Sequence, residues 1–354
     1  FTPEWRAFTG CGPAPCAMTR SHVVRGTTVT RCAIIVVMMW AAAARLASQQ
    51  NQPSPPATPD SPAIVEQLNR LKTSVGPRWA DAVHFWCEAP RANRADDPVI
   101  QPAKIFDNVY AIGNVGTVAY VIQTSAGLMM IDALGANQVE SDLLPGFTKL
   151  GLDPAQVKTI LVAHGHADHF GGSAYFQQKF GSKVYVSAAD WTLMDTPPRG
   201  RGPGTPPPAA PPKRDGELRD GESVTLGNVS VRAVAVPGHT PGSMGFVIPV
   251  IDRGERHVAA LFGGSWLTPG LLNDEAMKTY IASVAHFRQA TVDAGVDAWL
   301  QNHPLMVPFQ DWLTRLSSRG RTDTNPFVVG RAEYQKFLDV IDGCSRIALA
   351  RRGL

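Results

Sequence analysis

The sequence predicts an α/β fold in which two facing β-sheets carry helices on their outer faces. Two observations lead to this prediction. Short apolar runs typical of strands recur in two halves of the chain, and segments with helical spacing lie between them. With 354 residues and 44% hydrophobic composition, the chain can also bury one large core. Strand-rich halves with helices between the strands favour sheet packed on sheet, with helices outside.

The first half begins with a predicted hairpin. Its two strands are the apolar runs 117–123 (TVAYVIQ) and 128–132 (LMMID), which Gly127 separates. The next predicted elements alternate between helical spacing, at 139–150 and 172–180, and buried-strand patterns, at 158–163 (KTILVA) and 183–187. A short amphipathic helix is predicted upstream, at 64–71.

The second half repeats this arrangement. Its predicted elements are four strands, at 229–236, 245–250, 258–262 and 298–301, and a long helix at 275–294. Between the halves, residues 196–213 contain eight prolines, so this stretch can form neither a helix nor a central strand. We interpret it as a linker or as a loop beside an active site, and its position between the motifs described below favours the loop.

The first 62 residues precede the predicted fold. After Met18, three arginines lead into an apolar run at 33–44 (AIIVVMMWAAAA), and small residues follow at Ala47 and Ser48. This pattern predicts a secretory signal peptide over 18–48; a membrane anchor is the alternative, but the run is short of the ~20 apolar residues that span a bilayer. We therefore expect upstream sequence at 1–17, a proline-rich linker at 49–62 and one periplasmic or secreted domain at 63–354.

The cysteines restrict the possible cross-links. Cys11, Cys16 and Cys32 lie in the leader, so the expected mature chain keeps Cys87 and Cys344. Export permits a disulfide between these two, which would join the start of the domain to its last helix; two separate thiols are the alternative. Two cysteines are too few for a four-cysteine zinc site.

The charge distribution argues against a nucleic-acid partner. The formal net charge is +3, but five Arg and one Glu in the first 48 residues contribute +4, so the remaining chain carries 3 − 4 = −1. There is no long run of one sign. Because a nucleic-acid-binding domain usually carries a basic stripe, we expect none of that activity here.

The most informative motif is the run HGHADH, which directly follows the predicted strand that ends at Ala163. It places His164, His166, Asp168 and His169 within six residues. Imidazole nitrogens and carboxylate oxygens are ligands that zinc takes. A tight loop after a strand can aim alternate side chains at one point and the next pair at another, which suits two adjacent ions. Surface histidines are the alternative, but the carboxylate and the lack of tag-like repetition disfavour it.

Two further histidines follow predicted strands. His239 lies in the loop PGHTPG, after the strand that ends at Val236, and His303 lies in QNHP, after the strand near 298–300. Functional groups gather in such strand-end loops, although either histidine alone is more often structural. The other four histidines, in no comparable turn, are His22, His84, His257 and His286.

Together these motifs resemble the metallo-β-lactamase superfamily over about residues 105–308. The order of the HGHADH run, the PGHTPG loop and the late His-Pro turn is the family's, and an early strand ends in a turn at Asp132, as in the family. The resemblance implies the metallo-β-lactamase αββα sandwich, with two facing mixed sheets and helices outside. It also implies two Zn²⁺ ions, the first bound by His164, His166 and His239 and the second by Asp168, His169 and His303.

This ligand set resembles the third subclass of class B β-lactamases. Most other hydrolases of the superfamily, such as glyoxalase II and the lactonases, place a bridging aspartate after the strand near Leu261, and the first subclass places a cysteine there. Residues 262–266 (FGGSW) contain neither. Ser265 matches a serine that binds the substrate carboxylate in the third subclass, whereas Leu267 stands where a second such serine is often found, which counts against a β-lactam.

The resemblance therefore implies a zinc-dependent hydrolase, a β-lactamase that opens the ring amide through a hydroxide held by the metal ions. Asp168 would be a ligand and also the catalytic residue that orients the attacking water. Asp132 would accept a hydrogen bond from a ligand histidine, or would simply form a turn. Candidate apolar walls, each also a plausible core residue, are Trp191, Phe85 and Trp86.

The expected partner is a small molecule, either a β-lactam or a related cyclic amide or ester. We expect no nucleic acid and no membrane span in the mature chain. A hydrolase of a lactone, thioester or phosphoester on the same scaffold is the near alternative, since a fold does not fix a substrate. A non-catalytic periplasmic zinc-binding module is the alternative from another class.

Overall fold

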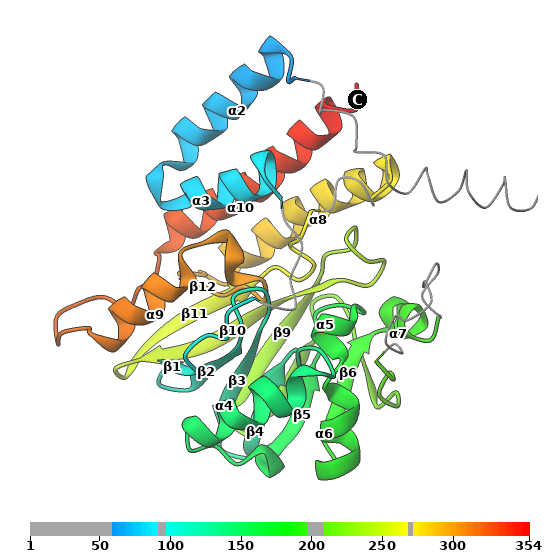
Figure 1. Cartoon of the computed structure of the whole chain (residues 1–354), viewed down its shortest axis with the longest axis vertical. Helices are drawn as coiled ribbons and strands as arrows, with labels where there is room; N and C mark the ends of the chain where they lie inside the picture. The colour runs from blue at the N-terminus through cyan, green and yellow to red at the C-terminus, as the bar shows by residue number, and fades with distance from the viewer. Residues whose placement is uncertain (1–58, 91–96, 197–208, 268–271) are drawn as a thin grey trace, which may run out of the picture. The chain divides into compact units, whose positions relative to one another are not determined.

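The computed structural model describes residues 59–90, 97–196, 209–267 and 272–354 (Figure 1). Asp60–Leu354 forms one compact unit. The predicted upstream segment, the signal peptide and most of the proline-rich linker lie outside the described residues, as does most of the second proline-rich stretch, at 197–208. None of the described helices is both long and apolar enough to cross a bilayer.

The first sheet has seven strands in the order β1-β2-β3-β4-β5-β6-β7. Strands β1 to β4 pair antiparallel and β4 to β7 pair parallel, so the sheet is mixed. Its strands are β1 (Ala103–Phe106), β2 (Val109–Gly113), β3 (Val118–Thr124), β4 (Gly127–Ile131), β5 (Val157–Leu161), β6 (Lys183–Ser187) and β7 (Gly216–Leu218). Strands β3 and β4 form the predicted hairpin. Gly127, the first residue of β4, has a φ of 118°, which glycine adopts more readily than other residues.

The second sheet has five strands in the order β12-β11-β10-β9-β8. All pairs are antiparallel except β11 with β12, so this sheet is mixed too. Its strands are β8 (Ser223–Leu226), β9 (Val229–Ala235), β10 (Met244–Asp252), β11 (Glu255–Leu261) and β12 (Ala298–Trp299).

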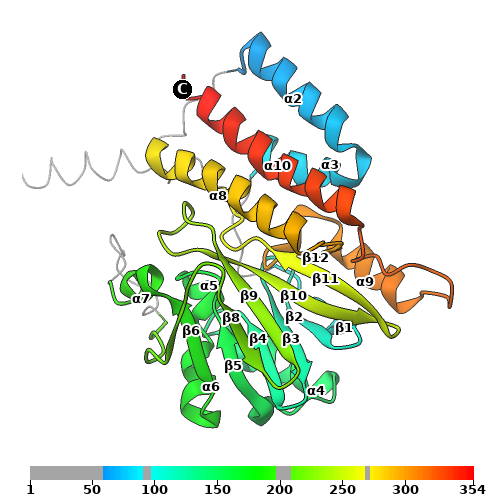
Figure 2. The ribbon, with the colours of Figure 1, turned by 180° about the vertical axis from the view of Figure 1, so that it is seen from behind.

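Helices cover the outer faces of both sheets. In Figures 1 and 2, α2, α8 and α10 lie on one side of the sheets, and α4 and α6 lie on the other. The helices are α2 (Pro62–Val75), α3 (Ala80–Val83), α4 (Leu144–Lys149), α5 (Ala167–Phe170), α6 (Ser173–Phe180), α7 (Ala188–Met194), α8 (Asp274–Asp293), α9 (Phe309–Ser317) and α10 (Arg331–Ala350). Single helical turns are η1 (Pro77–Trp79), η2 (His84–Glu88), η3 (Val139–Leu143), η4 (Pro154–Gln156) and η5 (Pro304–Met306).

Strand β3 shows how the first sheet contributes to two cores, one on each of its faces. Successive side chains of a strand point to opposite faces of the sheet. Tyr120 and Ile122 enter the core between the two sheets, whereas Ala119 and Val121 enter the core beneath α4 and α6. Both faces of the strand are therefore buried, and the predicted α/β sandwich with two mixed sheets and outer helices is confirmed.

Several elements differ from the prediction in extent. The strand predicted at 298–301 is only two residues long, and the helix predicted at 64–71 runs over Pro62–Val75, with the Ser61 hydroxyl accepting from the Ile64 amide. The helix predicted at 139–150 is a π-helical turn, η3, followed by α4. Strands β1, β2, β7 and β8 were not predicted from the sequence.

The two cysteines expected in the mature chain form a disulfide, Cys87–Cys344. Cys87 lies in η2 and Cys344 in α10, and both are buried. Of the two alternatives that the sequence left open, the disulfide is the one present, and it closes a loop across a sequence separation of 257 residues.

Candidate metal centre

The six predicted ligands lie in three segments that follow strands. The HGHADH run leaves β5 and passes into α5, the PGHTPG loop joins β9 to β10, and His303 follows β12. The structure brings all six side chains together in two groups of three.

The first group contains His164, His166 and His239, whose candidate ligand atoms all lie within 4.8 Å of one another. The Nε2 atom of His239 is 3.0 Å from Nδ1 of His166. Two ligand atoms bound at ~2.0–2.1 Å to one tetrahedral zinc ion would be roughly 3.3 Å apart, so this spacing suits a shared ion. Both ring nitrogens of His164 are buried and have no hydrogen-bond partner among the described residues. Such unsatisfied nitrogens fit a metal-binding role.

The second group contains Asp168, His169 and His303, again with candidate ligand atoms within 4.8 Å of one another. The Nε2 atoms of the two histidines are 3.1 Å apart, and Oδ2 of Asp168 lies 3.4 Å from Nε2 of His169. The two groups adjoin, because the ring centroids of His164 and His169 are 3.9 Å apart.

A carboxylate and a side-chain amide orient the ring of His169. Oδ2 of Asp132 lies 2.8 Å from Nδ1 of His169 and also accepts from Nδ2 of Asn302 at 2.9 Å. The other oxygen of Asp132 accepts from the backbone amide of Ala163 at 2.7 Å. Asp132 is fully buried and has a φ of 60°, a left-handed conformation that aspartate tolerates better than most residues. The expected contact between Asp132 and a ligand histidine is present, whereas the contact with Asn302 was not predicted from the sequence.

Backbone carbonyls orient two more rings. Nδ1 of His239 lies 2.7 Å from the carbonyl oxygen of Trp266, and Nδ1 of His303 lies 2.7 Å from that of Gly116. A carbonyl can only accept, so each Nδ1 carries the proton. The lone pair on Nε2 of both rings therefore points toward its group, as a metal ligand requires.

The electrostatics of the centre follow from its burial. Burial lowers the pKa of His164, and it lowers the pKa of His239 to about 3 and that of His303 to about 4. Burial alone would also lower the pKa of His169, but the carboxylates of Asp168 and Asp132 raise it to about 10. Most of the histidines are thus neutral, which is the form that binds metal.

Asp190, which was not predicted as a site residue, joins the two segments that carry the first group. Its Oδ2 accepts from the Gly165 amide at 2.7 Å and from the Thr240 hydroxyl at 2.6 Å, and its Oδ1 accepts from the Gly242 amide at 2.8 Å. Asp190 is fully buried, and burial raises the pKa of its carboxyl. Gly165 lies between two predicted ligands, and Thr240 follows His239. One carboxyl group therefore fixes both ligand-bearing loops.

The residues predicted to contact a substrate are Ser265 and three aromatic residues. Ser265 is fully buried, and its hydroxyl has no hydrogen-bond partner among the described residues, so its contact with a substrate stays a prediction. The proposal that Trp191, Phe85 and Trp86 form apolar walls is wrong. All three are buried and belong to the hydrophobic cores, because their rings pack between helices and sheets.

Comparisons with known proteins show similarity in sequence and in fold. Residues 112–250 match the family model described as Metallo-beta-lactamase superfamily. The chain carries a metallo-β-lactamase domain. Members of this superfamily bind metal, typically zinc, so the two groups are candidate metal sites.

Individual similarities cover different shares of the chain. An uncharacterised protein of Mycobacterium tuberculosis is 39% identical over 113 residues, which are 30% of this chain and 49% of that protein. A hydroxyacylglutathione hydrolase of Acidiphilium cryptum is 30% identical over 88 residues, 25% of this chain and 29% of that protein. The chain therefore spans half the length, or less, of these curated relatives.

Among solved structures, the subclass B3 metallo-β-lactamase BJP-1 of Bradyrhizobium japonicum matches with a TM-score of 0.56 at 24% identity. The match covers 73% of this chain and 92% of that one. The expected likeness to the third subclass is thus present in the fold.

Proposed function

We propose that this protein is a di-zinc hydrolase that opens the amide of a β-lactam ring. The observation that carries the proposal is the division of six candidate ligands into two adjoining groups of three. Three protein ligands per ion leave a coordination position for water, as catalytic zinc sites do. A bound pair of zinc ions would polarise the carbonyl and lower the pKa of a water molecule toward ~7.

The burial of the groups supports an approach of the substrate from one side. His164, His169 and His303 are buried, whereas His166 is exposed and His239 and Asp168 are partly exposed. The side chain of Asp168 is 38% exposed, and the neighbouring histidines hold its pKa below the usual range although burial opposes this. An ionised carboxylate on the open side can orient the attacking water and accept its proton.

A cavity of about 510 Å³ lies beside His239, between the PGHTPG loop and the first turns of α8. Its lining includes Pro241, Leu272 and Glu275. Its volume falls within the ~300–1,000 Å³ typical of small-molecule sites. We propose that this cavity holds the side chain of a small substrate.

Two observations favour a β-lactam over other substrates. Residues 262–266 hold no carboxylate that could bridge two ions, and the solved structure BJP-1 is a subclass B3 metallo-β-lactamase. A thioester is the second candidate, because one relative is a hydroxyacylglutathione hydrolase. Leu267 counts against a β-lactam, because it stands where a serine would help to bind the substrate carboxylate.

The test compares substrates on the same purified protein. Zinc-loaded protein is given a chromogenic cephalosporin and, separately, a thioester, a lactone and a phosphodiester, each with and without a chelator. Chelator-sensitive hydrolysis of the cephalosporin is expected. Hydrolysis of only the thioester or lactone would end the β-lactamase proposal, and no turnover by a fully metallated sample would favour a zinc-binding module.

We further propose that the protein works in the periplasm or outside the cell. The Cys87–Cys344 disulfide supports this location, because disulfides persist in oxidising compartments and are rare in the cytosol. Thiol labelling of protein from cell fractions tests it; a reduced pair in cytosolic protein would oppose it.

A further inference from the structure

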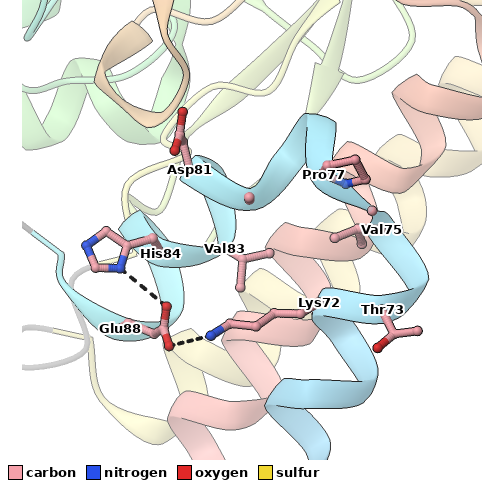
Figure 3. A pocket seen from close by; sticks show the side chains of 10 residues that line it. Lys72, Thr73, Val75, Pro77, Asp81, Val83, His84 and Glu88 are labelled. Atoms are coloured by element: carbon pink, nitrogen blue, oxygen red, sulfur yellow. Dashed lines mark hydrogen bonds and ion pairs between the residues drawn. The ribbon is translucent and has the colours of Figure 1, made fainter.

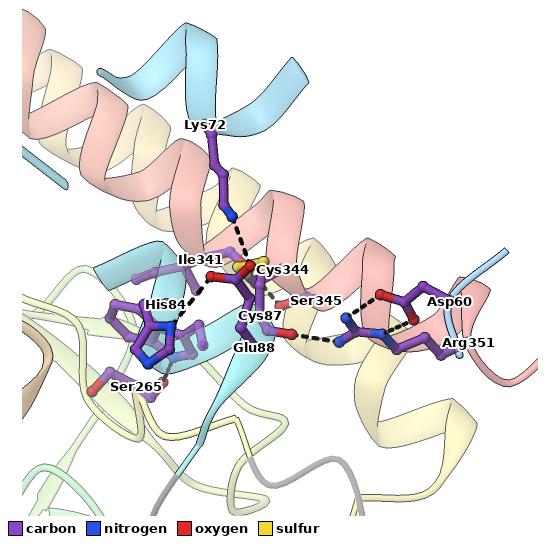
Figure 4. The surroundings of a disulfide bond; sticks show 11 residues. Asp60, Lys72, His84, Cys87, Glu88, Ser265, Ile341, Cys344, Ser345 and Arg351 are labelled. Atoms are coloured by element: carbon purple, nitrogen blue, oxygen red, sulfur yellow. Dashed lines mark hydrogen bonds and ion pairs between the residues drawn. A yellow bond between two sulfur atoms is a disulfide. The ribbon is translucent and has the colours of Figure 1, made fainter. Parts of the chain in front are cut away.

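The helical turn η2 is anchored to the outer helices at three points. Besides the Cys87–Cys344 disulfide, Glu88 of η2 pairs with Lys72 of α2 at 2.6 Å (Figure 3). Arg351, directly after α10, donates to the Cys87 carbonyl and forms a bidentate pair with Asp60 (Figure 4). The turn is therefore held to both α2 and α10.

The same turn reaches the loop at 263–267, which borders the metal centre. Nε1 of Trp86 donates to the carbonyl oxygen of Ser265 at 2.7 Å, and the ring of Phe85 packs edge-on against Trp266 at 5.5 Å. Tyr280 of α8 donates to the same Ser265 carbonyl at 3.0 Å. Two side chains from different helices thus fix one peptide group of this loop.

That loop contacts a histidine from each ligand group. The carbonyl of Trp266, one residue after the anchored one, accepts from Nδ1 of His239 at 2.7 Å, and the ring of Trp266 lies edge-on to His303 at 5.2 Å. The loop passes so close to His239 that a Cβ at Gly264 would lie 2.8 Å from the His239 Cβ. With a φ of 63°, Gly264 also has a backbone conformation that favours glycine.

We propose that Trp86 is a positioning residue for the metal centre and that the disulfide holds it in place. Trp86 fixes the Ser265 carbonyl, the adjoining Trp266 carbonyl fixes the proton of His239 on Nδ1, and Nε2 of His239 is thereby aimed at its group. This inference rests on the proposed function, because it assumes that His239 binds metal. Loss of a partner that orients a ligand typically costs 10–100-fold in metal affinity, and Trp86 acts one peptide further away, so about tenfold is expected.

The decisive variant is Trp86→Phe, which keeps an aromatic ring in the core and removes only the N–H donor and the second ring. Zinc-loaded protein is titrated with a competing chelator, and the cobalt-substituted protein is followed by its visible absorption spectrum. About tenfold weaker binding of one ion and a changed cobalt spectrum are expected. The matched control is Trp79→Phe, because Trp79 lies in the same aromatic cluster but its indole nitrogen has no hydrogen-bond partner among the described residues.

A second variant keeps the inference testable if Trp86→Phe fails to fold. Tyr280→Phe removes the other donor to the Ser265 carbonyl and leaves the ring, and a smaller loss of metal affinity is expected. The double variant Cys87→Ala, Cys344→Ala should also weaken binding, whereas Arg319→Ala, which breaks a distant ion pair with Asp252, should lower stability alone.

The outcomes separate the two proposals. If the unmodified protein binds no zinc, the proposed function fails. If it binds zinc and both Trp86→Phe and Tyr280→Phe retain its affinity and its cobalt spectrum, the positioning role of Trp86 is overturned and the proposed function stands. An affinity loss equal to that of Trp79→Phe would also overturn it, since the effect would then come from packing.

Discussion

Replacement of Asp190 should weaken metal binding by the first ligand group more than binding by the second. In Asp190→Ala, the amides of Gly165 and Gly242 lose their acceptor inside the fold, whereas the Thr240 hydroxyl keeps Ser243 Oγ at 2.7 Å as a partner. A buried donor left unsatisfied costs about 1–3 kcal/mol, so two such donors cost about 2–6 kcal/mol in the free energy of unfolding.

The isosteric variant Asp190→Asn sets the scale of the effect. Its one remaining oxygen can still accept from Gly165 and Thr240 if the new amide group faces Gly242. Only one donor then loses its acceptor, and the expected cost is about 1–3 kcal/mol. The ordering of the two variants therefore follows from the number of donors each leaves without a partner.

Two measurements test this reasoning. Urea unfolding of the metal-free variants gives the change in stability, and cobalt titration reports the ligand groups separately through their spectra. The group of His164, His166 and His239 should bind more weakly in both variants, with the group of Asp168, His169 and His303 less affected. An alanine variant with unchanged stability and full metal content would refute the idea that Asp190 joins the two loops.

Three further outcomes are expected. His166→Ala should lose at least one of two metal ions per chain, whereas His286→Ala, on the exposed face of α8, should lose none; equal metal content in the two would contradict the assignment. The pKa of His169 is raised from 6.5 to about 10 by neighbouring carboxylates, so its contribution to the stability of the metal-free protein is complete below pH 6.5 and is lost as the pH rises toward 10. Zinc uptake near pH 8 should therefore release a proton, and a calorimetric heat independent of the buffer would oppose this. Removing the Cys87–Cys344 disulfide should cost roughly 5 kcal/mol of stability, since it closes a very long loop, and an unchanged midpoint in urea would argue against that.

The ligand loops could be predicted because each gives a local signal. The HGHADH run and the PGHTPG loop directly follow apolar runs that are strands in the structure, β5 and β9. Strand ends project side chains over one edge of a sheet, so the grouping of distant histidines followed from the fold. Asp132 could also be predicted, as a residue at the end of β4.

Asp190 could not be predicted in the same way. An aspartate in the first turn of a helix is common, because it faces the helix N-terminus, and this one lies in the first turn of α7. Its partners Gly165 and Gly242 are 25 and 52 residues away in sequence, and both offer backbone amides, which no side-chain pattern reveals. Trp86 is similar, since its partner is a carbonyl 179 residues away.

The differences in secondary structure also have physical causes. The helix predicted at 139–150 contains Pro145, which lacks an amide hydrogen and cannot continue the bonding of the preceding turn. The regular helix α4 therefore starts anew at Leu144. Strands β7 and β8 span three and four residues, too few for an alternation of polar and apolar side chains to stand out.

The ion pair between Asp60 and Arg351 brings the first and last elements of the compact unit to the same place, close to the disulfide. Between Cys87 and Cys344 the polypeptide is a covalent ring that contains both sheets and every candidate ligand. A protease that cuts one surface loop inside this ring would yield two fragments that cannot diffuse apart. The domain should therefore tolerate a cut in such a loop better than a sandwich without the cross-link would. The same should hold for circular permutation at that loop.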